Sequence, residues 1–207
     1  MVLSNFGKAI LFLNHMKIGL FFGSFNPVHT GHLILANYLV EESDLDELWL
    51  VISPHNPFKE RSTLADDYVR YEMVLRSVED HPKLKACNVE FDLPKPSYTI
   101  DTLKYLSEEH PEHEFVLIMG GDNLASLNKW KNYEQILLNY SIYVYKRPEY
   151  QLGELASHSR IKIFENAPLI EISSTFIRKL IKEGKSIRYW VTEETREIIE
   201  STALYRP

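Results

Sequence analysis

The residues best placed to do chemistry lie in a ten-residue segment, GSFNPVHTGH, that runs from Gly23 to His32. Gly23 lets the backbone leave a strand tightly and come close to a ligand. Thr30 can cap the helix that follows, whose first N–H groups then face an anion. His29 and His32 are three positions apart, so their side chains lie on the same side of the helix start. Two imidazoles beside such N–H groups favour the binding of a polyphosphate.

Two other interpretations of this segment stay open on the residues alone. A histidine near a helix start is often a cap or a surface residue, and imidazole is also a common metal ligand. The HxxH spacing is a weak metal signature by itself, because the segment contains no cysteine or glutamate that would complete a site.

Hydroxyl groups gather at a second expected helix start, in the sequence ISSTFIR that ends at Arg178. Ser173, Ser174 and Thr175 are natural caps, and the N–H groups beside them offer another anion site. Arg178 lies one turn further on, where its planar guanidinium can reach a phosphate. Taken alone, the segment also fits a capped surface helix with a solvated arginine. Together with the histidine segment, it favours a second phosphate contact.

A third group of residues follows the strongest apolar run, 115–119. Gly120 and Gly121 permit close contact between the backbone and a nucleotide. Asp122 can accept hydrogen bonds from ribose hydroxyls, as an acidic residue does in dinucleotide sites. Trp130 offers a flat face to an aromatic ring, although a core position is equally typical of tryptophan.

Short apolar runs alternate with amphipathic stretches along the chain, which predicts a parallel sheet covered by helices on both faces. We therefore expect an α/β fold, a Rossmann-like doubly wound parallel sheet with a small C-terminal helical extension. Ligands of such sheets bind beyond the carboxyl ends of the strands, so the loops after Phe22, Ile52, Met119 and Tyr145 should form the site. The predicted strands are 18–22, 48–52, 89–91, 115–119, 141–145 and 161–164, and the predicted helices are 32–42, 66–79, 99–109, 124–139, 174–183 and 192–202.

Composition limits the classes of function. The 207 residues carry a formal net charge of −6, which argues against a nucleic-acid partner because such binding needs a basic field. The single cysteine, Cys87, excludes an internal disulfide and fits the reducing cytoplasm, and a semi-buried, unreactive thiol is expected there. The apolar group at 9–13 is far too short to span a membrane. We expect residues 1–15 to be an extension outside the fold and residues 16–207 to form a single domain.

The first two segments resemble known signatures. GSFNPVHTGH is similar to the HxGH motif of the nucleotidyltransferase superfamily, and ISSTFIR resembles the ISSTxIR motif of its adenylyltransferases. The later segments, in their order and spacing, resemble those of the bacterial nicotinate-nucleotide adenylyltransferases. These segments are PSYT at 96–99, GGDNL at 120–124, Trp130 and KRP at 146–148. The resemblance covers about residues 16–206.

The resemblance implies transfer of the adenylyl group of ATP to nicotinate mononucleotide, which gives deamido-NAD and pyrophosphate. Mg²⁺ is expected to bind mainly through the ATP phosphates, without a metal cage built by the protein. The implied catalytic residues are His32, His29 and Arg178. The implied ATP-binding residues are Gly23, Ser24, Phe25, Gly31, Gly120, Asp122, Ser173, Ser174 and Thr175, and the implied substrate-binding residues are Tyr98, Thr99, Trp130, Lys59 and Arg147.

The chain departs from that family in two places. Asn26 stands where the family usually has aspartate, and we expect it to keep the turn. The loop at 53–59 is shorter than in the family, and Pro57 and Lys59 alone align well. Lys59 fits a phosphate contact or an exposed loop lysine.

Rival functions remain at this stage. Nicotinamide mononucleotide or phosphopantetheine is an alternative acceptor, and cytidylyl transfer is an alternative reaction. From other classes, a catalytically silent nucleotide sensor and an RNA-binding module are the competing hypotheses. A sensor would be expected to lose His29, His32 or Arg178, and all three are present. The sequence leaves open whether the protein forms a homo-oligomer.

Overall fold

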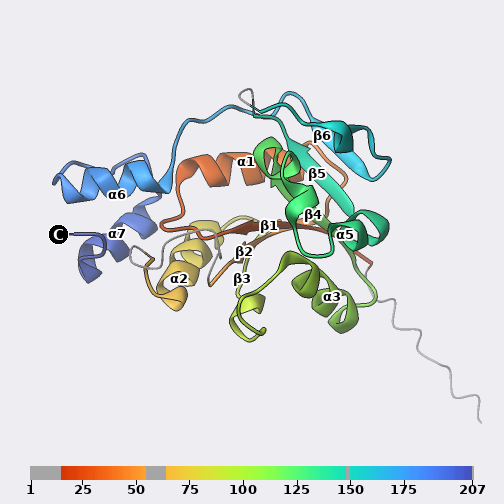
Figure 1. The fold of residues 1–207 in the computed structure, drawn as a ribbon. Coiled ribbons are helices and arrows are strands. Elements are labelled where there is room, and N and C mark those ends of the chain that lie inside the picture. The colour runs from red at the N-terminus through yellow and green to blue at the C-terminus, as the bar shows by residue number, and fades with distance from the viewer. Residues whose placement is uncertain (1–14, 55–63, 148–149, 207) are drawn as a thin grey trace, which may run out of the picture.

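Six strands pair in parallel in the order β3-β2-β1-β4-β5-β6 (Figure 1). The structure, a computed structural model, describes residues 15–54, 64–147 and 150–206, so most of the expected extension at 1–15 lies outside it. The strands are β1 (Lys17–Gly23), β2 (Glu47–Ile52), β3 (Leu84–Cys87), β4 (Glu114–Gly120), β5 (Ser141–Tyr145) and β6 (Ile161–Phe164).

The chain changes direction across the sheet between β1 and β4. It builds β1, β2 and β3 toward one edge, then returns to pair β4 with the other side of β1 and continues to β5 and β6. Gly23 ends β1 opposite Ile52 of β2, while Gly120 ends β4 opposite Tyr145 of β5. The carboxyl ends of four strands therefore meet where a doubly wound sheet binds its ligands.

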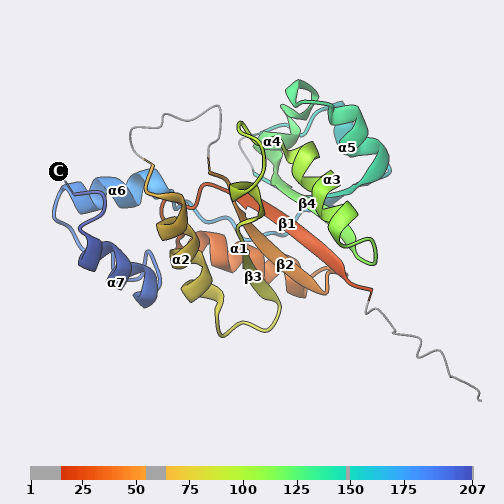
Figure 2. The ribbon, with the colours of Figure 1, turned by 90° about the horizontal axis from the view of Figure 1, so that it is seen from below.

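Successive side chains of each strand point to opposite faces, and each face has its own helices. Ile18 and Leu20 of β1 pack with α3, α5 and the segment between α4 and α5, while Phe21 packs with α1, α2, α6 and α7. Figure 2 shows these two groups of helices on opposite sides of the sheet. The helices are α1 (Thr30–Glu41), α2 (Asp67–Val78), α3 (Thr99–Glu109), α4 (Gly121–Leu124), α5 (Tyr133–Asn139), α6 (Ser174–Lys182) and α7 (Glu193–Thr202), and the 3₁₀ turns are η2 (Val89–Phe91), η3 (Leu127–Lys129) and η4 (Glu154–Ser157).

The last two helices form the expected C-terminal helical extension, and α7 is held against α2. Ser77 Oγ lies 2.9 Å from Thr192 Oγ1 and 3.0 Å from the buried Thr195 Oγ1. Ile199 joins the apolar cluster on the same face. In the described part of the chain, no helix has the length and apolar character needed to cross a membrane.

The structure corrects the expected third strand. The strand is Leu84–Cys87, and residues 89–91 form a 3₁₀ turn. An edge strand needs few apolar residues, and Leu84 alone is buried against the core. The turn instead buries the carboxylate of Glu90 between Ser97 and Thr102, which the apolar neighbours of Glu90 do not indicate.

Two expected helices also differ in extent. The region 124–139 is split into α4, η3 and α5, and α5 is separated from η3 by Asn132, which adopts a left-handed conformation with φ of 50°. The first helix begins at Thr30, and its cap is His29. Thr30 is not the cap, because its hydroxyl donates to the carbonyl of Trp190.

Candidate active site

The two histidines of the first segment lock each other at the start of α1. The backbone N–H of His32 donates to Nδ1 of His29, and the backbone N–H of His29 donates to Nδ1 of His32, both at 3.3 Å. Their rings are stacked, with centroids 3.5 Å apart. Since each Nδ1 accepts a hydrogen bond from the backbone, the neutral form of each ring carries its proton on Nε2. The reciprocal cap therefore gives both imidazoles the same tautomer.

Burial keeps His29 neutral. Its residue is 5% exposed, and desolvation lowers the pKa of His29 to about 4. A neutral ring can accept from the backbone at Nδ1 and still donate from Nε2. At neutral pH, His29 thus offers a hydrogen-bond donor at Nε2 without a positive charge.

We expect this burial to make the protein less stable in mild acid. The unfolded chain protonates His29 near pH 6.5 and the folded chain near 4, so the unfolded state binds more protons between these values. The stability that His29 contributes is present above pH 6.5 and is lost as the pH falls toward 4. Between pH 7 and pH 5 the free energy of unfolding should fall by up to about 2 kcal/mol through this group.

Urea denaturation at the two pH values measures this effect. His29→Asn keeps a good helix cap but removes the imidazole, so its stability should depend less on pH by that amount. An equal pH dependence in the wild type and His29→Asn would assign the acid sensitivity to other groups.

Phe25 and Gly31 set the position of the two rings. The Phe25 ring stands edge-on to His32, with centroids 5.0 Å apart, and a Cβ on Gly23 would approach it to 2.7 Å. Phe25 itself has a φ of 43°, a conformation that non-glycine residues rarely adopt and that is frequent at ligand sites. A Cβ on Gly31 would lie 3.1 Å from Nδ1 of His29. The glycines therefore leave the space that the rings occupy.

The second segment packs directly on the first. Arg178 Nη1 donates to the carbonyl of Asn26 at 2.8 Å, and Ser174 Oγ donates to the carbonyl of Pro27 at 2.9 Å. Ser173 caps α6 by accepting from the N–H of Phe176. The Nη2 atom of Arg178 also lies 3.3 Å from Thr175 Oγ1. The start of α6 is thus joined to the loop that precedes the start of α1.

Asn26 is the junction of this loop. Its side-chain oxygen accepts from the N–H of Ala65 at 3.1 Å and from the hydroxyl of Tyr205 at 2.6 Å. The residue is 5% exposed. Aspartate has the same acceptor oxygen, so both donors are satisfied although asparagine replaces the family's usual residue. Asn26 thus holds the turn to Ala65 and to the C-terminal segment in this chain.

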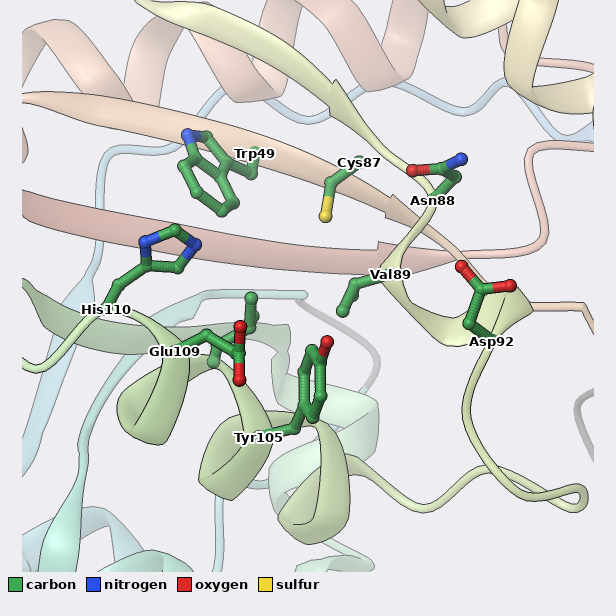
Figure 3. Close-up of a pocket in the computed structure, with 9 residues that line it drawn as sticks. Trp49, Cys87, Asn88, Val89, Asp92, Tyr105, Glu109 and His110 are labelled. Atoms are coloured by element: carbon green, nitrogen blue, oxygen red, sulfur yellow. The ribbon is translucent and has the colours of Figure 1, made fainter.

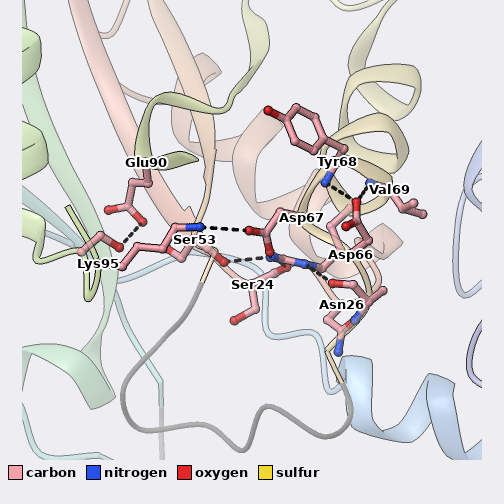
Figure 4. A network of polar contacts seen from close by, with 12 residues as sticks. Ser24, Asn26, Ser53, Asp66, Asp67, Tyr68, Val69, Glu90 and Lys95 are labelled. Carbon is pink, nitrogen blue, oxygen red and sulfur yellow. Dashed lines mark hydrogen bonds and ion pairs between the residues drawn. The ribbon is translucent and has the colours of Figure 1, made fainter. Parts of the chain in front are cut away.

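Arg70 supports the site and is not identified by the sequence motifs. It is fully buried, and its guanidinium donates to the carbonyls of Ser24, Ser53 and Ala65. It also pairs with Asp67 at 2.6 Å. Figure 4 shows Ser24, Ser53 and Asp67 gathered around this point. One side chain thereby joins the loops after β1 and β2 to the start of α2. The sequence does carry a signal for this role. Arg70 is a charged residue three positions before Met73, which places it on the apolar face of the helix.

The third segment lies at the end of β4. A Cβ on Gly120 would come within 2.4 Å of Asp122 Oδ1 and 3.0 Å of the Tyr145 side chain, so glycine lets both side chains lie close to the end of the strand. Asp122 Oδ1 is buried without a hydrogen bond, and Nε of Arg147 lies 3.5 Å from it. Phe21 packs against Tyr145, which connects this end of β4 and β5 with β1. Arg147 therefore lies beside Asp122, although the sequence assigned the two residues to different ligands.

Two of the expected acceptor-binding residues, Tyr98 and Thr99, lie at the start of α3. Tyr98 occupies the N-cap position of this helix without a capping hydrogen bond from its side chain, and Lys131 Nζ lies 4.4 Å from the centre of the Tyr98 ring. Trp130 is half-buried and packs against the apolar cluster on this face. Lys59 and Pro57 lie outside the described residues.

Glu90 ties this region to the strand ends. Its carboxylate accepts from Thr102 Oγ1 at 2.8 Å and from Ser97 Oγ at 3.1 Å. Burial raises the pKa of Glu90, while its hydrogen bonds, including one from Ser53, act in the opposite direction. Ser53 in turn donates its backbone N–H to the carbonyl of Gly23. The acceptor-binding region is therefore connected to the histidine segment through two residues.

A separate hollow of about 280 Å³ lies between α3 and the β3 edge of the sheet (Figure 3). Trp49, Cys87, Tyr105 and His110 are among the residues that line it. Burial raises the pKa of the Cys87 thiol to about 11, which fits the unreactive thiol expected from the sequence. The hollow contains no residue of the three segments.

The comparisons with known proteins agree with the fold and the class of protein. Residues 20–180 match the family model described as cytidylyltransferase-like, which places the chain in the nucleotidyltransferase class. The nicotinic acid mononucleotide adenylyltransferase of Plasmodium falciparum, in a structure complexed with NaAD, has the same fold. Its TM-score is 0.77 at 22% identity, with 92% of this chain and 98% of that chain covered.

Curated relatives identify the family within the nucleotidyltransferase class. A probable nicotinate-nucleotide adenylyltransferase of Cytophaga hutchinsonii is 53% identical over 92% of this chain and 98% of the relative. One of the same name from Flavobacterium johnsoniae is 52% identical over 92% of this chain and all of the relative. The chain belongs to the nicotinate-nucleotide adenylyltransferase family.

Proposed function

We propose that the protein transfers the adenylyl group of ATP to nicotinate mononucleotide and releases pyrophosphate. The observation that carries this proposal is the contact between the two helix starts, made by Arg178 on the Asn26 carbonyl and Ser174 on the Pro27 carbonyl. Together the two starts place imidazoles, hydroxyls, backbone N–H groups and a guanidinium around one region, which suits a triphosphate. A single cysteine in the chain supports a cytoplasmic location.

The reaction needs positioning more than a strong base. A phosphate oxygen of the mononucleotide, ionised near neutral pH, attacks the α-phosphorus of ATP, and the bond to the β-phosphate oxygen breaks. Pyrophosphate leaves with the electron pair of that bond. Catalysis then consists of alignment and stabilisation of the developing charge, as in phosphoryl transfer generally.

The histidines and Arg178 supply that stabilisation. With each Nδ1 engaged by the backbone, His29 and His32 donate from Nε2 to phosphate oxygens. Arg178 keeps its charge and is fixed by Asn26, so it holds the leaving pyrophosphate together with Ser173, Ser174 and Thr175 at the start of α6. These donors are in place before the substrate binds, which avoids a reorganisation cost during the reaction.

The remaining motif residues orient the two nucleotides. Gly120 and Asp122 hold the ATP ribose, and Gly23, Ser24, Phe25 and Gly31 bring the backbone close to its phosphates. The start of α3 at Tyr98 and Thr99 receives the nicotinate carboxylate, and Trp130 provides a face for the pyridine ring. Arg147 and Lys59 complete the proposed substrate contacts.

Nucleotidyltransferases of this kind generally use a metal ion, and we propose Mg²⁺. The residues proposed to contact the triphosphate, which are His29, His32, Arg178 and the hydroxyls of α6, include no carboxylate, so they fit an ion that is held by the substrate phosphates. When bound, Mg²⁺ neutralises phosphate charge. Chelation with EDTA should therefore abolish turnover without unfolding the protein.

Parallel assays of pyrophosphate release test the proposal. The protein is incubated with Mg²⁺ and ATP, and with nicotinate mononucleotide, nicotinamide mononucleotide or phosphopantetheine as the acceptor. Cytidine triphosphate replaces ATP in a fourth arm. We expect strong release with ATP and nicotinate mononucleotide.

Each other outcome changes a different part of the proposal. Equal release with nicotinamide mononucleotide would show that the carboxylate is not selected. Release with phosphopantetheine alone would identify a different acceptor. Release with cytidine triphosphate alone would identify a different nucleotide donor. No turnover in any arm would favour a nucleotide sensor.

A further inference from the structure

A second set of ligand-type side chains lies at the other end of the sheet, in the turn between α3 and β4. The backbone N–H of His113 donates to the carbonyl of His110 at 3.0 Å, which closes the turn. His15, just before β1, has its Nδ1 2.6 Å from the carbonyl of Glu112. The turn is thus held by its own backbone and by the segment before β1, so its side chains have a defined position.

Three of these side chains converge. Oε1 of Glu112 lies 3.6 Å from Nε2 of His113 and 3.9 Å from Nδ1 of His110. One ligand atom from each residue lies within 4.8 Å of the other two. Two atoms bound to a tetrahedral Zn²⁺ at about 2.0–2.1 Å would be about 3.3 Å apart. Shifts of a few tenths of an ångström would therefore bring the carboxylate and either imidazole onto one ion.

The two histidines of the cluster differ in burial. The side chain of His113 is 12% exposed, and its Nε2, the atom near Glu112, is the nitrogen that would bind the ion. The side chain of His110 is 42% exposed, so the cluster is reachable from solvent on that side. Figure 3 shows His110 at the end of α3, where its ring also faces Trp49.

The local charge favours a cation. His110 caps the carboxyl end of α3, where the helix dipole is negative. The last turn of α3 contains Glu108 and Glu109 and no basic residue. A bound cation would offset both the helix dipole and these carboxylates.

We propose that His110, Glu112 and His113 bind one divalent transition-metal ion. Two imidazoles and one carboxylate suit Zn²⁺ better than Mg²⁺ or Ca²⁺, which prefer sites made of oxygen atoms. The site lies at the amino end of β4, whereas the histidine segment lies at the carboxyl ends of the strands. The turn that carries the site also contacts the segment before β1 through His15. The metal site is independent of the proposed adenylyl transfer.

Calorimetric titration with ZnCl₂ tests the site, using untagged protein that has been stripped with EDTA and desalted, without nucleotide. We expect one Zn²⁺ per chain. Glu112→Gln should raise the dissociation constant at least about tenfold, since changes even in the outer shell of metal sites have effects of that size. The double variant His110→Gln/His113→Gln should lose binding. His158→Gln, which alters a histidine outside the cluster, is the matched control and should bind normally.

The His29 and His32 pair is the competing site. Undiminished binding by both Glu112→Gln and the double variant would assign the ion to that pair or elsewhere, and would overturn the proposal. So would the absence of binding by the wild type at concentrations up to about 1 mM, the range of weak association. Pyrophosphate release by the double variant should equal that of the wild type, because these residues lie outside the proposed catalytic machinery.

Discussion

Replacement of His32 by alanine should lower kcat by about 10²–10³-fold while the chain still folds. The Nδ1 of His32 accepts from the His29 backbone, so its Nε2–H is oriented as a donor to the substrate phosphates. Loss of one such donor removes stabilisation that is strongest in the transition state, and kcat should fall more than KM rises. Steady-state measurement of pyrophosphate release gives both constants.

The reciprocal cap requires a control, because His32→Ala also removes the acceptor for the His29 N–H. Loss of a cap costs about 1 kcal/mol of stability, which urea denaturation will detect. His32→Gln restores a capping group at the same helical position but has no imidazole. We expect His32→Gln to recover stability and to remain slow. If its kcat matches that of the wild type, His32 acts through the helix start alone.

Replacement of Arg70 by methionine should lower the free energy of unfolding by about 3–5 kcal/mol. Methionine fills much of the space, but it leaves the carbonyls of Ser24, Ser53 and Ala65 buried without their donor. The loops after β1 and β2 should then lose their common anchor. We therefore expect kcat/KM to fall as well, even under conditions where the variant is fully folded.

Arg76→Met on the same helix is the matched control. Arg76 is partly exposed and lies 3.4 Å from Glu197 at the surface, so its loss should cost at most about 1 kcal/mol. Urea denaturation of both variants gives the comparison. If Arg70→Met is no less stable than Arg76→Met, the buried guanidinium does not hold the two loops.

Much of the fold could be predicted from the sequence, because its strands are long enough to be recognised. Near-continuous apolar runs at β1, β2, β4 and β5 are typical of buried parallel strands, and all four lie within one or two residues of their predicted bounds. The histidine and hydroxyl segments also predicted two helix starts, each suited to a phosphate. The direct contact between these starts, through Arg178 and Ser174, is known from the structure.

The parts that were not predicted depend on contacts between distant residues. Leu84–Cys87 becomes a strand because β2 offers it a partner, although residues 89–91 look more apolar. The burial of Arg70 depends on carbonyls from two loops that are remote in the sequence. Likewise, Asn26 and Tyr205 are separated by 179 positions, so no local pattern relates them.

The hydroxyl of Tyr205 on Asn26 has a consequence for synthesis on the ribosome. The histidine segment is translated early, but Arg178 and Tyr205, which contact its loop, are translated near the end of the 207 residues. A nascent chain therefore carries its imidazoles for more than 140 further residues before Arg178 is made. The loop acquires these contacts only after Arg178 and Tyr205 have left the exit tunnel.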